Sequence, residues 1–403
     1  MSDSVVTSGV GGAGEREPLG PARTAAYDPL ELHERLCQEP SLLSALSRPL
    51  ASVAGGRLYL VSDLARSFAV ADGGATTLSA SACVLGAFDG VHVGHRGLVR
   101  AAAEGARRRR APVVAVTFDP DPACVLGGSG TDSELLSVDE RLCVLASLGL
   151  DALLVVPFTN ELAATPYERF LTDVLLPAIH PSEVHVGANF RMGAGGLGTV
   201  EALAACARPA GVEVFGHELA CADGAPVSAT RIRSLVHDGD VAAAAGLLGR
   251  FHELGGTVVR GRGEGTAFGF PTANIELSPT SCRPAEGVYA AVAVAGGHAW
   301  PAAVNVGAPR TFGGKEGVPF FEATLLGFSG NLYGSELSVC FVEWLREPRT
   351  FPSLAELERT VLGNVEWVRR YVGEGDLLAN NADTPAAPAS SALSDGGADG
   401  PRS

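Results

Sequence analysis

The stretch Val84–Val99, VLGAFDGVHVGHRGLV, constrains this chain more than any other. Its apolar start is typical of the end of a strand, its glycines of a turn, and its later apolar spacing of a helix. Such an arrangement places backbone N–H groups and the positive end of a helix where a phosphate can lie. His92 and His95, separated by Gly94, would add donors that follow charge on a phosphoryl group. The alternative is that both are ordinary turn or cap histidines.

Composition sets the broad class of protein. The chain has 403 residues, enough for two or three domains, and 46% of them are hydrophobic, which is ample for packed cores. The formal net charge of −15 argues against a nucleic-acid partner. The basic run Arg107–Arg110 is expected on the solvated end of the helix that follows the histidine turn.

Cysteine usage and hydropathy indicate the compartment. The 8 cysteines include no C-x-x-C and no Cys/His cluster, which favours reduced thiols over a disulfide framework or a zinc site. No apolar run reaches the ~18 residues of a membrane span, and the N-terminus lacks a basic-then-apolar signal. We therefore expect a cytoplasmic enzyme with no membrane partner.

Periodicity predicts the domain organisation. Residues 1–55 are expected to be a flexible extension, and residues 375–403, rich in Ala, Asp, Ser, Pro and Gly, a disordered tail. Between 56 and 237, short apolar strands alternate with amphipathic stretches, which predicts a doubly wound parallel sheet with right-handed crossovers. Residues 238–249 predict an Ala-rich linking helix.

The pattern changes in the segment 250–374. Short apolar runs separated by Gly and Pro predict a small antiparallel barrel there, followed by a C-terminal helix over 353–372 that is interrupted near Gly363. The barrel strands expected are Gly256–Val259, Val288–Val294, Pro301–Val306, Phe320–Leu326 and Leu337–Val342.

Three further stretches would reach the carboxyl edge of the parallel sheet, where ligands bind in such folds. They are Phe118–Pro122 (FDPDP), Gly187–Gly198 (GANFRMGAGGLG) and Val227–Arg233 (VSATRIR). Hydroxyl groups beside arginine at a helix start suit pyrophosphate oxygens. The alternative is that Ser228 and Thr230 only cap the helix.

The motif G-x-F-D-G-x-H-x-G-H and these three stretches occur in the same order in the bacterial FAD synthetases, which this chain resembles over about residues 80–236. The resemblance implies transfer of an adenylyl group from ATP to FMN. It implies catalytic roles for His92, His95 and Arg231, and places Asn189 and Arg191 near the flavin. The ATP and phosphate contacts that it implies are Gly86, Phe88, Asp89, Gly94, Ser228 and Thr230.

The chain departs from the usual pattern of that family at four positions. The family usually has Asn where this chain has Ala87, and often His where it has Asp121. It commonly has an acidic residue in place of Ala188 and Ser in place of Ala229. None of these changes removes the two histidines or the arginine, so we expect activity.

The second half of the chain contains a glycine-rich stretch, Gly261–Asn274, with the sequence GRGEGTAFGFPTAN. Its early glycines allow backbone amides to approach a phosphate. Thr272 and Asn274 offer oxygens two residues apart, which would suit Mg²⁺. The alternative is a β-turn whose hydroxyl and amide groups satisfy the local backbone.

Five motifs in order decide between these interpretations. G-F-P-T-A-N is followed by G-V-Y at 287–289, N-V-G at 305–307, F-E at 321–322 and L-Y-G at 332–334. Together they resemble the flavokinases over about residues 250–370. The resemblance implies a barrel that phosphorylates riboflavin, with Mg²⁺ on Thr272 and Asn274 and ATP phosphates beside Gly261, Gly263 and Gly269.

Glu322 lies within an apolar stretch, PFFEATLLGF, where an unpaired carboxylate is costly. The resemblance implies that it accepts the proton of the ribityl 5′-hydroxyl, and a buried structural ion pair is the alternative. One departure is that the family's P-T-F is here Arg310-Thr311-Phe312, after Pro309, which would alter the loop near the flavin.

The whole chain is thus similar to the bacterial bifunctional riboflavin kinase/FAD synthetases. The resemblance predicts an enzyme that makes FMN from riboflavin and ATP, then FAD from FMN and a second ATP, with Mg²⁺ and no covalent intermediate. The alternatives are a kinase with a silent adenylyltransferase domain, an adenylyltransferase for another phosphorylated substrate, and a non-catalytic flavin-sensing module. The expected partners are small molecules, and the sequence makes no prediction of oligomeric state.

Overall fold

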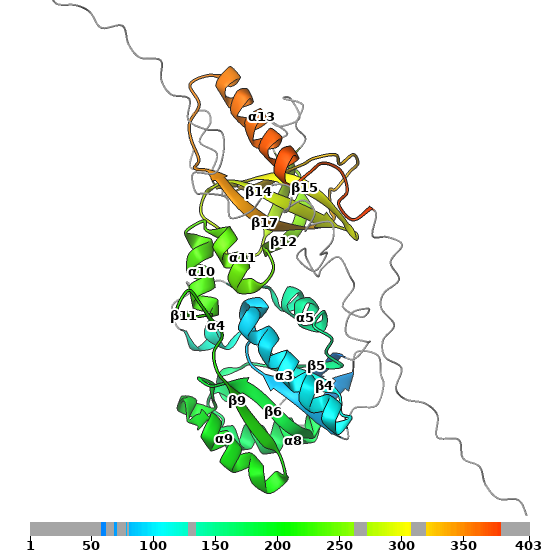
Figure 1. Ribbon diagram of the computed structural model, residues 1–403, viewed down its shortest axis with the longest axis vertical. Helices are drawn as coiled ribbons and strands as arrows, with labels where there is room; N and C mark the ends of the chain where they lie inside the picture. Colours follow the sequence, from blue (N-terminus) through cyan, green and yellow to red (C-terminus); the bar gives the residue numbers. More distant parts are fainter. Residues whose placement is uncertain are drawn as a thin grey trace, which may run out of the picture.

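The computed structural model describes residues 58–61, 68–70, 78, 80–127, 134–261, 272–307 and 320–379 (Figure 1). The predictions for residues 1–55, for the tail beyond residue 379 and for Gly263, Gly269 and Arg310 lie outside these described residues.

Parallel pairing dominates the first half of the described chain. A seven-stranded sheet has the order β2-β1-β5-β4-β3-β6-β9, and each neighbouring pair is parallel except β1 with β2. Its strands are β1 (Leu58–Val61), β2 (Phe68–Val70), β3 (Ser81–Leu85), β4 (Val113–Asp119), β5 (Ala152–Pro157), β6 (Pro181–Gly187) and β9 (Glu213–His217). The residues of β3 and nearly all those of β4 and β5 are buried, as expected for strands covered on both faces.

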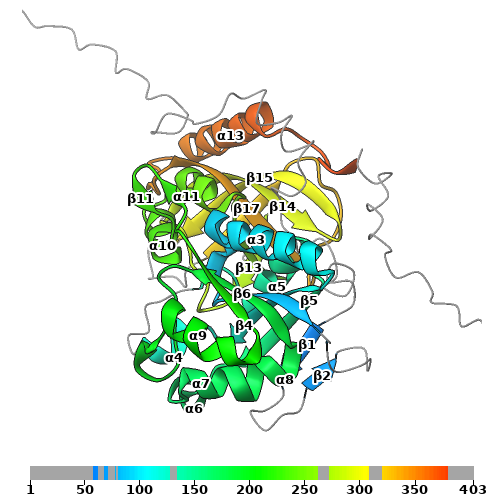
Figure 2. The same ribbon diagram turned by 60° about the horizontal axis from the view of Figure 1, so that its bottom comes forward.

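Helices cover both faces of this sheet (Figure 2), which confirms the doubly wound arrangement. On one face, apolar residues of α3 (Val93–Arg109) and α5 (Val138–Ala146) pack against β3, β4 and β5. On the other face, the covering helices are α7 (Tyr167–Phe170), a π-helical turn (Leu171–Leu175), α8 (Leu176–Ile179) and α9 (Val200–Ala207). The shorter elements at the carboxyl edge are α4 (Pro122–Leu126), α6 (Asn160–Ala163), β7 (Arg191–Met192), β8 (Gly198–Thr199), β10 (Cys221–Ala222) and β11 (Ala225–Pro226).

The turn between β3 and α3 has an unusual backbone. Phe88 and Val91 both have positive φ, at 58° and 41°, and Gly90 between them has a φ of 71°. A Cβ atom at Gly90 would lie 2.8 Å from Cδ1 of Leu135, so this position requires glycine for both its conformation and its space. The conformation of this turn is therefore fixed by close packing against Leu135.

Two helices lead from the sheet domain to the barrel: α10 (Ala229–His237) and α11 (Val241–Leu248). The predicted Ala-rich helix is α11, whose first turn is capped by Asp240, with its carboxylate accepting from the N–H of Ala243 at 3.2 Å. Gly249 ends the helix with a φ of 69°. Helix α11 packs on β12 and β17 of the barrel.

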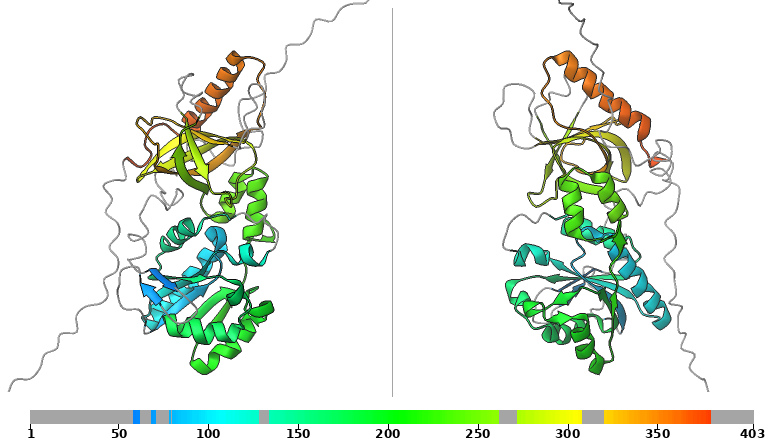
Figure 3. Two further views of the ribbon diagram at one scale, coloured as in Figure 1. Left: turned by 180° about the vertical axis from the view of Figure 1, so that it is seen from behind. Right: turned by 60° about the vertical axis from the view of Figure 1, so that its left-hand side comes forward.

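The second half of the described chain is a closed antiparallel barrel (Figure 3) in the order β12-β13-β16-β15-β14-β17, as predicted. Its strands are β12 (His252–Val259), β13 (Ala273–Leu277), β14 (Gly287–Ala295), β15 (His298–Gly307), β16 (Phe320–Leu325) and β17 (Glu336–Arg346). Helix α13 (Leu354–Tyr371) packs on β14 and β15. The expected interruption near Gly363 was wrong, since α13 is continuous through that residue.

The barrel and the sheet domain make direct contacts. Arg250, which is 4% exposed, donates from Nη1 to the carbonyl of Gly90 at 2.8 Å. Glu134 bonds through its backbone to Thr280 and Cys282, at 2.8 and 2.9 Å. The turn between β3 and α3 is thus braced by a residue from the start of the barrel. Within the described part of the chain, no helix is long and apolar enough to cross a membrane.

Candidate functional site

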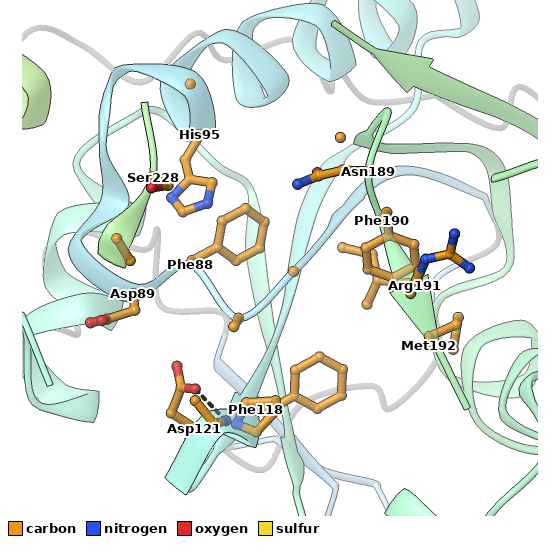
Figure 4. Close-up of a pocket in the computed structure, with 18 of the residues that line it drawn as sticks. Phe88, Asp89, His95, Phe118, Asp121, Asn189, Phe190, Arg191, Met192 and Ser228 are labelled. Carbon is orange, nitrogen blue, oxygen red and sulfur yellow. Dashed lines mark hydrogen bonds between the residues drawn. The ribbon is translucent and has the colours of Figure 1, made fainter. Parts of the chain in front are cut away.

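A cavity of about 950 Å³ lies at the carboxyl edge of the parallel sheet (Figure 4). Its wall comes from the turn after β3, the ends of β4, β6 and β9, and the start of α10. The predicted site residues that line it are Gly86, Phe88, Asp89, His92, Gly94, His95, Asn189, Arg191 and Ser228. Thr230 and Arg231 do not line it.

His92 and His95 form a stacked pair at the start of α3. Their ring centroids are 3.7 Å apart with an interplanar angle of 15°, and the ring of Phe88 meets His95 edge-on at 5.0 Å. The Nδ1 atoms of both histidines are buried without a hydrogen-bond partner, and His92 makes no side-chain cap to the helix. Both rings can therefore offer hydrogen bonds to a ligand.

Burial keeps these rings neutral. It lowers the pKa of His92 to about 4, helped by the positive charge of Arg250. It also lowers the pKa of His95 well below the usual value, helped by His92. At neutral pH each ring therefore offers one N–H donor, and nearby phosphates would raise the proton affinity of both rings.

Asp89 and Arg233 form an ion pair at the cavity wall. Nη1 of Arg233 lies 2.5 Å from Oδ2 of Asp89, whose Oδ1 accepts from the N–H of Leu135 at 3.0 Å. Burial raises the pKa of the Asp89 carboxyl to about 6, and Arg233 opposes that rise. This carboxylate therefore orients Arg233 while leaving it beside the cavity.

Arg233 is a cavity residue that the sequence prediction missed. Along α10, Ala229 and Arg233 are four residues apart and share one helix face, and both line the cavity. Arg231 instead donates to the carbonyls of Ala222 and Ala225, at 2.9 and 3.2 Å. Helical spacing from Ser228 and Ala229 could have indicated Arg233. The role given to Thr230 stays a prediction, and Arg233 becomes the alternative to Arg231 as the cation that would contact the phosphates.

Arg141 braces the floor of the site. Its side chain is 1% exposed and donates to the carbonyls of Ala87 and Phe118, at 3.1 and 2.6 Å. It also bonds to Oδ2 of Asp121 at 3.2 Å, and Oδ1 of Asp121 caps α4. Two of the departures from the family pattern, Ala87 and Asp121, therefore take part in this hydrogen-bond network. Ala87 accepts through its backbone carbonyl, and Asp121 accepts through both carboxylate oxygens.

Aromatic side chains gather at one end of the cavity. Phe118 lies 5.6 Å from Phe158 and 6.1 Å from Phe170, between ring centroids. Phe190 and Met192 also line the cavity, on the loop that carries Asn189 and Arg191 (Figure 4). This end suits a planar aromatic ligand, while the histidine end suits phosphates.

In the barrel, the register brings the second set of predicted residues together. Glu322 on β16 lies directly opposite Asn274 on β13 and Asn305 on β15. Directly opposed residues share one face of a sheet, so these three side chains lie side by side. A Cβ atom at Gly261 would collide with the amide of Asn274, so the backbone there approaches closely. Asn305 was not predicted as a site residue.

Known proteins resemble both halves of the chain. A family model described as FAD synthetase matches residues 75–231, and one described as riboflavin kinase matches residues 248–372. The "Bifunctional riboflavin kinase/FMN adenylyltransferase" of Escherichia coli (strain K12) is 32% identical over 294 residues, which cover 72% of this chain and 93% of that protein. The protein of the same name from Bacillus subtilis (strain 168) is 28% identical over 300 residues, or 72% and 92%.

A solved structure resembles most of the fold. It is described as a macrolide-efflux protein from Streptococcus pneumoniae and aligns with a TM-score of 0.67 and 27% sequence identity. The alignment covers 77% of this chain and 98% of that one. The arrangement of a parallel sheet domain followed by a barrel is therefore shared with a known structure.

Proposed function

This chain belongs to the family of bifunctional riboflavin kinase/FMN adenylyltransferases, and from that premise we propose which of its residues carry each reaction. The protein is a transferase with two activities. One transfers a phosphoryl group from ATP to riboflavin and gives FMN and ADP. The other transfers an adenylyl group from ATP to FMN and gives FAD and pyrophosphate. We assign adenylylation to residues 56–237 and phosphorylation to 250–374, with 238–249 as the link.

In the adenylyltransferase, the observation that carries the assignment is the stacked His92–His95 pair, which lines the same cavity as Ser228 and Arg233. ATP phosphates would lie between them, where the start of α3 adds backbone donors. An oxygen of the FMN phosphate attacks the α-phosphorus, and the bond to the departing pyrophosphate breaks. The imidazole N–H groups and Arg233 stabilise the charge that develops on the phosphate oxygens.

The flavin would occupy the aromatic end of this cavity. Phe118 and Phe158 offer faces and edges for the ring system, and Asn189 and Arg191 offer polar contacts beside it. The departures from the family pattern at Ala87 and Asp121 are compatible with activity. Arg141 still holds both segments, through the backbone carbonyl of Ala87 and the carboxylate of Asp121.

In the kinase, we assign Glu322 as the base for the 5′-hydroxyl of riboflavin. The attack forms a bond from that oxygen to the γ-phosphorus, breaks the bond to ADP, and passes the hydroxyl proton to the carboxylate. The juxtaposition of Glu322 with Asn274 and Asn305 supports this role, because two neutral amides can orient a carboxylate without neutralising it.

The same corner fits Mg²⁺. Asn274 lies opposite Glu322, and Thr272 comes two residues before Asn274, so the two would provide neutral oxygen ligands. Mg²⁺ prefers hard oxygen donors completed by phosphate and water. The described residues contain no cluster of three or more His, Cys, Asp or Glu side chains that could hold a metal alone, so the ion would arrive with ATP. When bound, it would neutralise phosphate charge during transfer.

We also propose that the enzyme works in the cytoplasm. The cysteines in the described ranges are all free thiols, from Cys83 to Cys340, which supports a reducing compartment.

A product time course with riboflavin, ATP and Mg²⁺ tests the two assignments. The parent protein should accumulate FMN and then FAD. Glu322→Ala should make no FMN yet still convert added FMN to FAD, and His95→Ala should make FMN without FAD. FAD formation undiminished in His95→Ala would remove the adenylyltransferase assignment, and FMN binding without ATP consumption would identify a sensor.

A further inference from the structure

A hydrogen-bonded chain of three side chains lies outside the predicted site and ends at the cavity. His185 Nε2 lies 3.2 Å from Oε2 of Glu183, and His185 Nδ1 lies 2.9 Å from Nε2 of His217. Glu183 and His185 come from β6 and are 2% and 3% exposed, whereas His217 ends β9 and lines the cavity. We call these residues the Glu–His–His chain.

The surroundings of the chain fix its geometry. Arg109 of α3 donates from Nε to Oε1 of Glu183 at 2.5 Å, and Phe215 stacks on His185 with centroids 5.0 Å apart. A Cβ atom at Gly105 of α3 would collide with Oε2 of Glu183. Glycine is less favourable than alanine inside a helix, and here it makes room for the carboxylate. Helix α3 therefore packs closely against β6 at Glu183.

Hydrogen-bond chemistry then sets the tautomers. Burial opposes ionisation of Glu183, but hydrogen bonds from Arg109 and His185 outweigh it and hold the pKa of that carboxyl below its usual value. Burial lowers the pKa of both His185 and His217. At neutral pH the chain therefore holds one carboxylate and two neutral rings.

A carboxylate can only accept, so Nε2 of His185 carries a hydrogen and its Nδ1 is an acceptor. Nε2 of His217 must then donate to that Nδ1. Nδ1 of His217 is left with its lone pair, and within the described ranges no protein group donates to it. The Glu–His–His chain therefore presents the cavity with a hydrogen-bond acceptor of fixed identity.

Strand order places this acceptor within the cavity. The histidine pair follows β3, the aromatic residues Phe118 and Phe158 belong to β4 and the end of β5 on one side, and His217 ends β9 on the other. With a flavin at the aromatic end and phosphates beside the histidine pair, the side of the cavity at the end of β9 is left for the nucleoside of ATP. This step rests on the proposed adenylyltransferase function.

We propose that His217 recognises the adenine base, with Nδ1 accepting a hydrogen bond from its exocyclic 6-amino group, and that His185 and Glu183 are positioning residues that fix this tautomer. A base without the amino group leaves this acceptor unpaired in the complex. The cavity then selects ATP over purine riboside 5′-triphosphate, which lacks only that group.

Nucleotide competition on the full-length protein tests this proposal. FAD formation from FMN and Mg²⁺ is measured with ATP and with purine riboside 5′-triphosphate, in the parent, His217→Leu, His217→Asn and His185→Leu. The parent should prefer ATP by about tenfold in kcat/KM, mostly through KM, which corresponds to one hydrogen bond. His217→Leu should lose the preference.

The asparagine variant should retain part of the preference, because its amide oxygen can replace Nδ1 as acceptor. His185→Leu should weaken it, since Nε2 of His217 then has no acceptor to fix the tautomer. Riboflavin kinase activity of each variant, read on the same polypeptide, reports whether the barrel is intact. The preference is the ratio of the kcat/KM values for the two nucleotides, measured on the same protein sample. A smaller folded fraction lowers both values equally and leaves the ratio unchanged.

Two results would overturn the proposal. Equal use of both nucleotides by the parent would do so without any variant, even if His217→Leu did not fold. A preference unchanged in His217→Leu, or an equal loss for both nucleotides as expected of a ribose contact, would also exclude base recognition. Failure of the proposed function is a separate outcome, namely that the parent forms no FAD from FMN and ATP.

Discussion

Asp89 and Arg233 are 144 residues apart in the sequence, yet Oδ2 of Asp89 and Nη1 of Arg233 are 2.5 Å apart. The pair joins the turn that carries the two histidines to the helix that begins after Ser228. The ion pair therefore links the two sides of the proposed phosphate site, which is the preorganisation that electrostatic catalysis requires.

Arg233→Ala should lower kcat/KM for FAD formation by about 100-fold or more, because it removes the cation that we propose stabilises the transferred phosphate. FMN formation should not change. The matched control is Arg231→Ala, two residues away on the same helix, whose side chain bonds to the carbonyls of Ala222 and Ala225. We expect less than a tenfold effect there. A larger loss in Arg231→Ala than in Arg233→Ala would reverse the assignment.

Glu322→Gln should lower the rate of riboflavin phosphorylation by about 10²–10⁴-fold, the usual contribution of a general base. Conversion of added FMN to FAD should be unaffected. Glu276→Gln is the control, since Glu276 is an exposed carboxylate on β13, close in sequence to Asn274. Steady-state rates with riboflavin and ATP decide the matter, and a Glu322→Gln rate within threefold of the parent would leave Glu322 a structural residue.

Arg141→Met should destabilise the sheet domain by about 3–5 kcal/mol, because it leaves the carboxylate of Asp121 and two buried carbonyls without their partner. Urea unfolding followed by circular dichroism and by loss of FAD formation measures the change. Arg108→Met, at an exposed position of α3, should stay within about 0.5 kcal/mol of the parent. Equal stability of the two variants would contradict the bracing role of Arg141.

His252 predicts a pH dependence of barrel stability. Its ring is buried, Nε2 lies 2.9 Å from the carbonyl of Cys282, and burial lowers its pKa to about 4. The unfolded chain, with a pKa near 6.5, binds more protons as pH falls from 6.5 to 4, so this group's contribution to stability is present above 6.5 and is lost over that interval.

His252→Gln does not undergo this loss. Its deficit in stability relative to the parent should therefore shrink by on the order of 2 kcal/mol between pH 7.5 and pH 4.5. Tryptophan fluorescence during urea unfolding reports the barrel alone, because Trp300, Trp344 and Trp367 all belong to the second half of the chain. A deficit that is the same at both pH values would show that His252 titrates normally.

Local patterns predicted most of the fold. The turn between β3 and α3, the alternation of strands and helices, and most barrel strands follow from short-range periodicity, and the structure confirms them. Strand β13 was missed because Thr272 and Asn274 were interpreted as part of a phosphate loop; Asn274 lies within the strand, opposite Glu322. A short strand rich in polar residues carries little apolar alternation to detect.

The missed cavity residues depend on contacts between distant elements. The motif around Ser228 contains two arginines, and only the helix face distinguishes Arg233 from Arg231. His185 and His217 lie 32 residues apart and meet because β6 and β9 pair in parallel, a register that no local pattern specifies. The basic run Arg107–Arg110 is exposed at the end of α3, as expected, and Arg109 from this run also bonds to the buried Glu183.

The hydrogen bond from Arg250 to the carbonyl of Gly90 bears on how far the two catalysts can be separated. A fragment that stops at Leu248 would keep every residue assigned to adenylylation, yet it would lack the guanidinium that holds the histidine turn in place. Joining the two domains in one chain therefore does more than keep them close together, because the kinase half supplies a contact that supports the adenylyltransferase half. The two activities are assigned to separate segments of the sequence, but the two segments are not structurally independent.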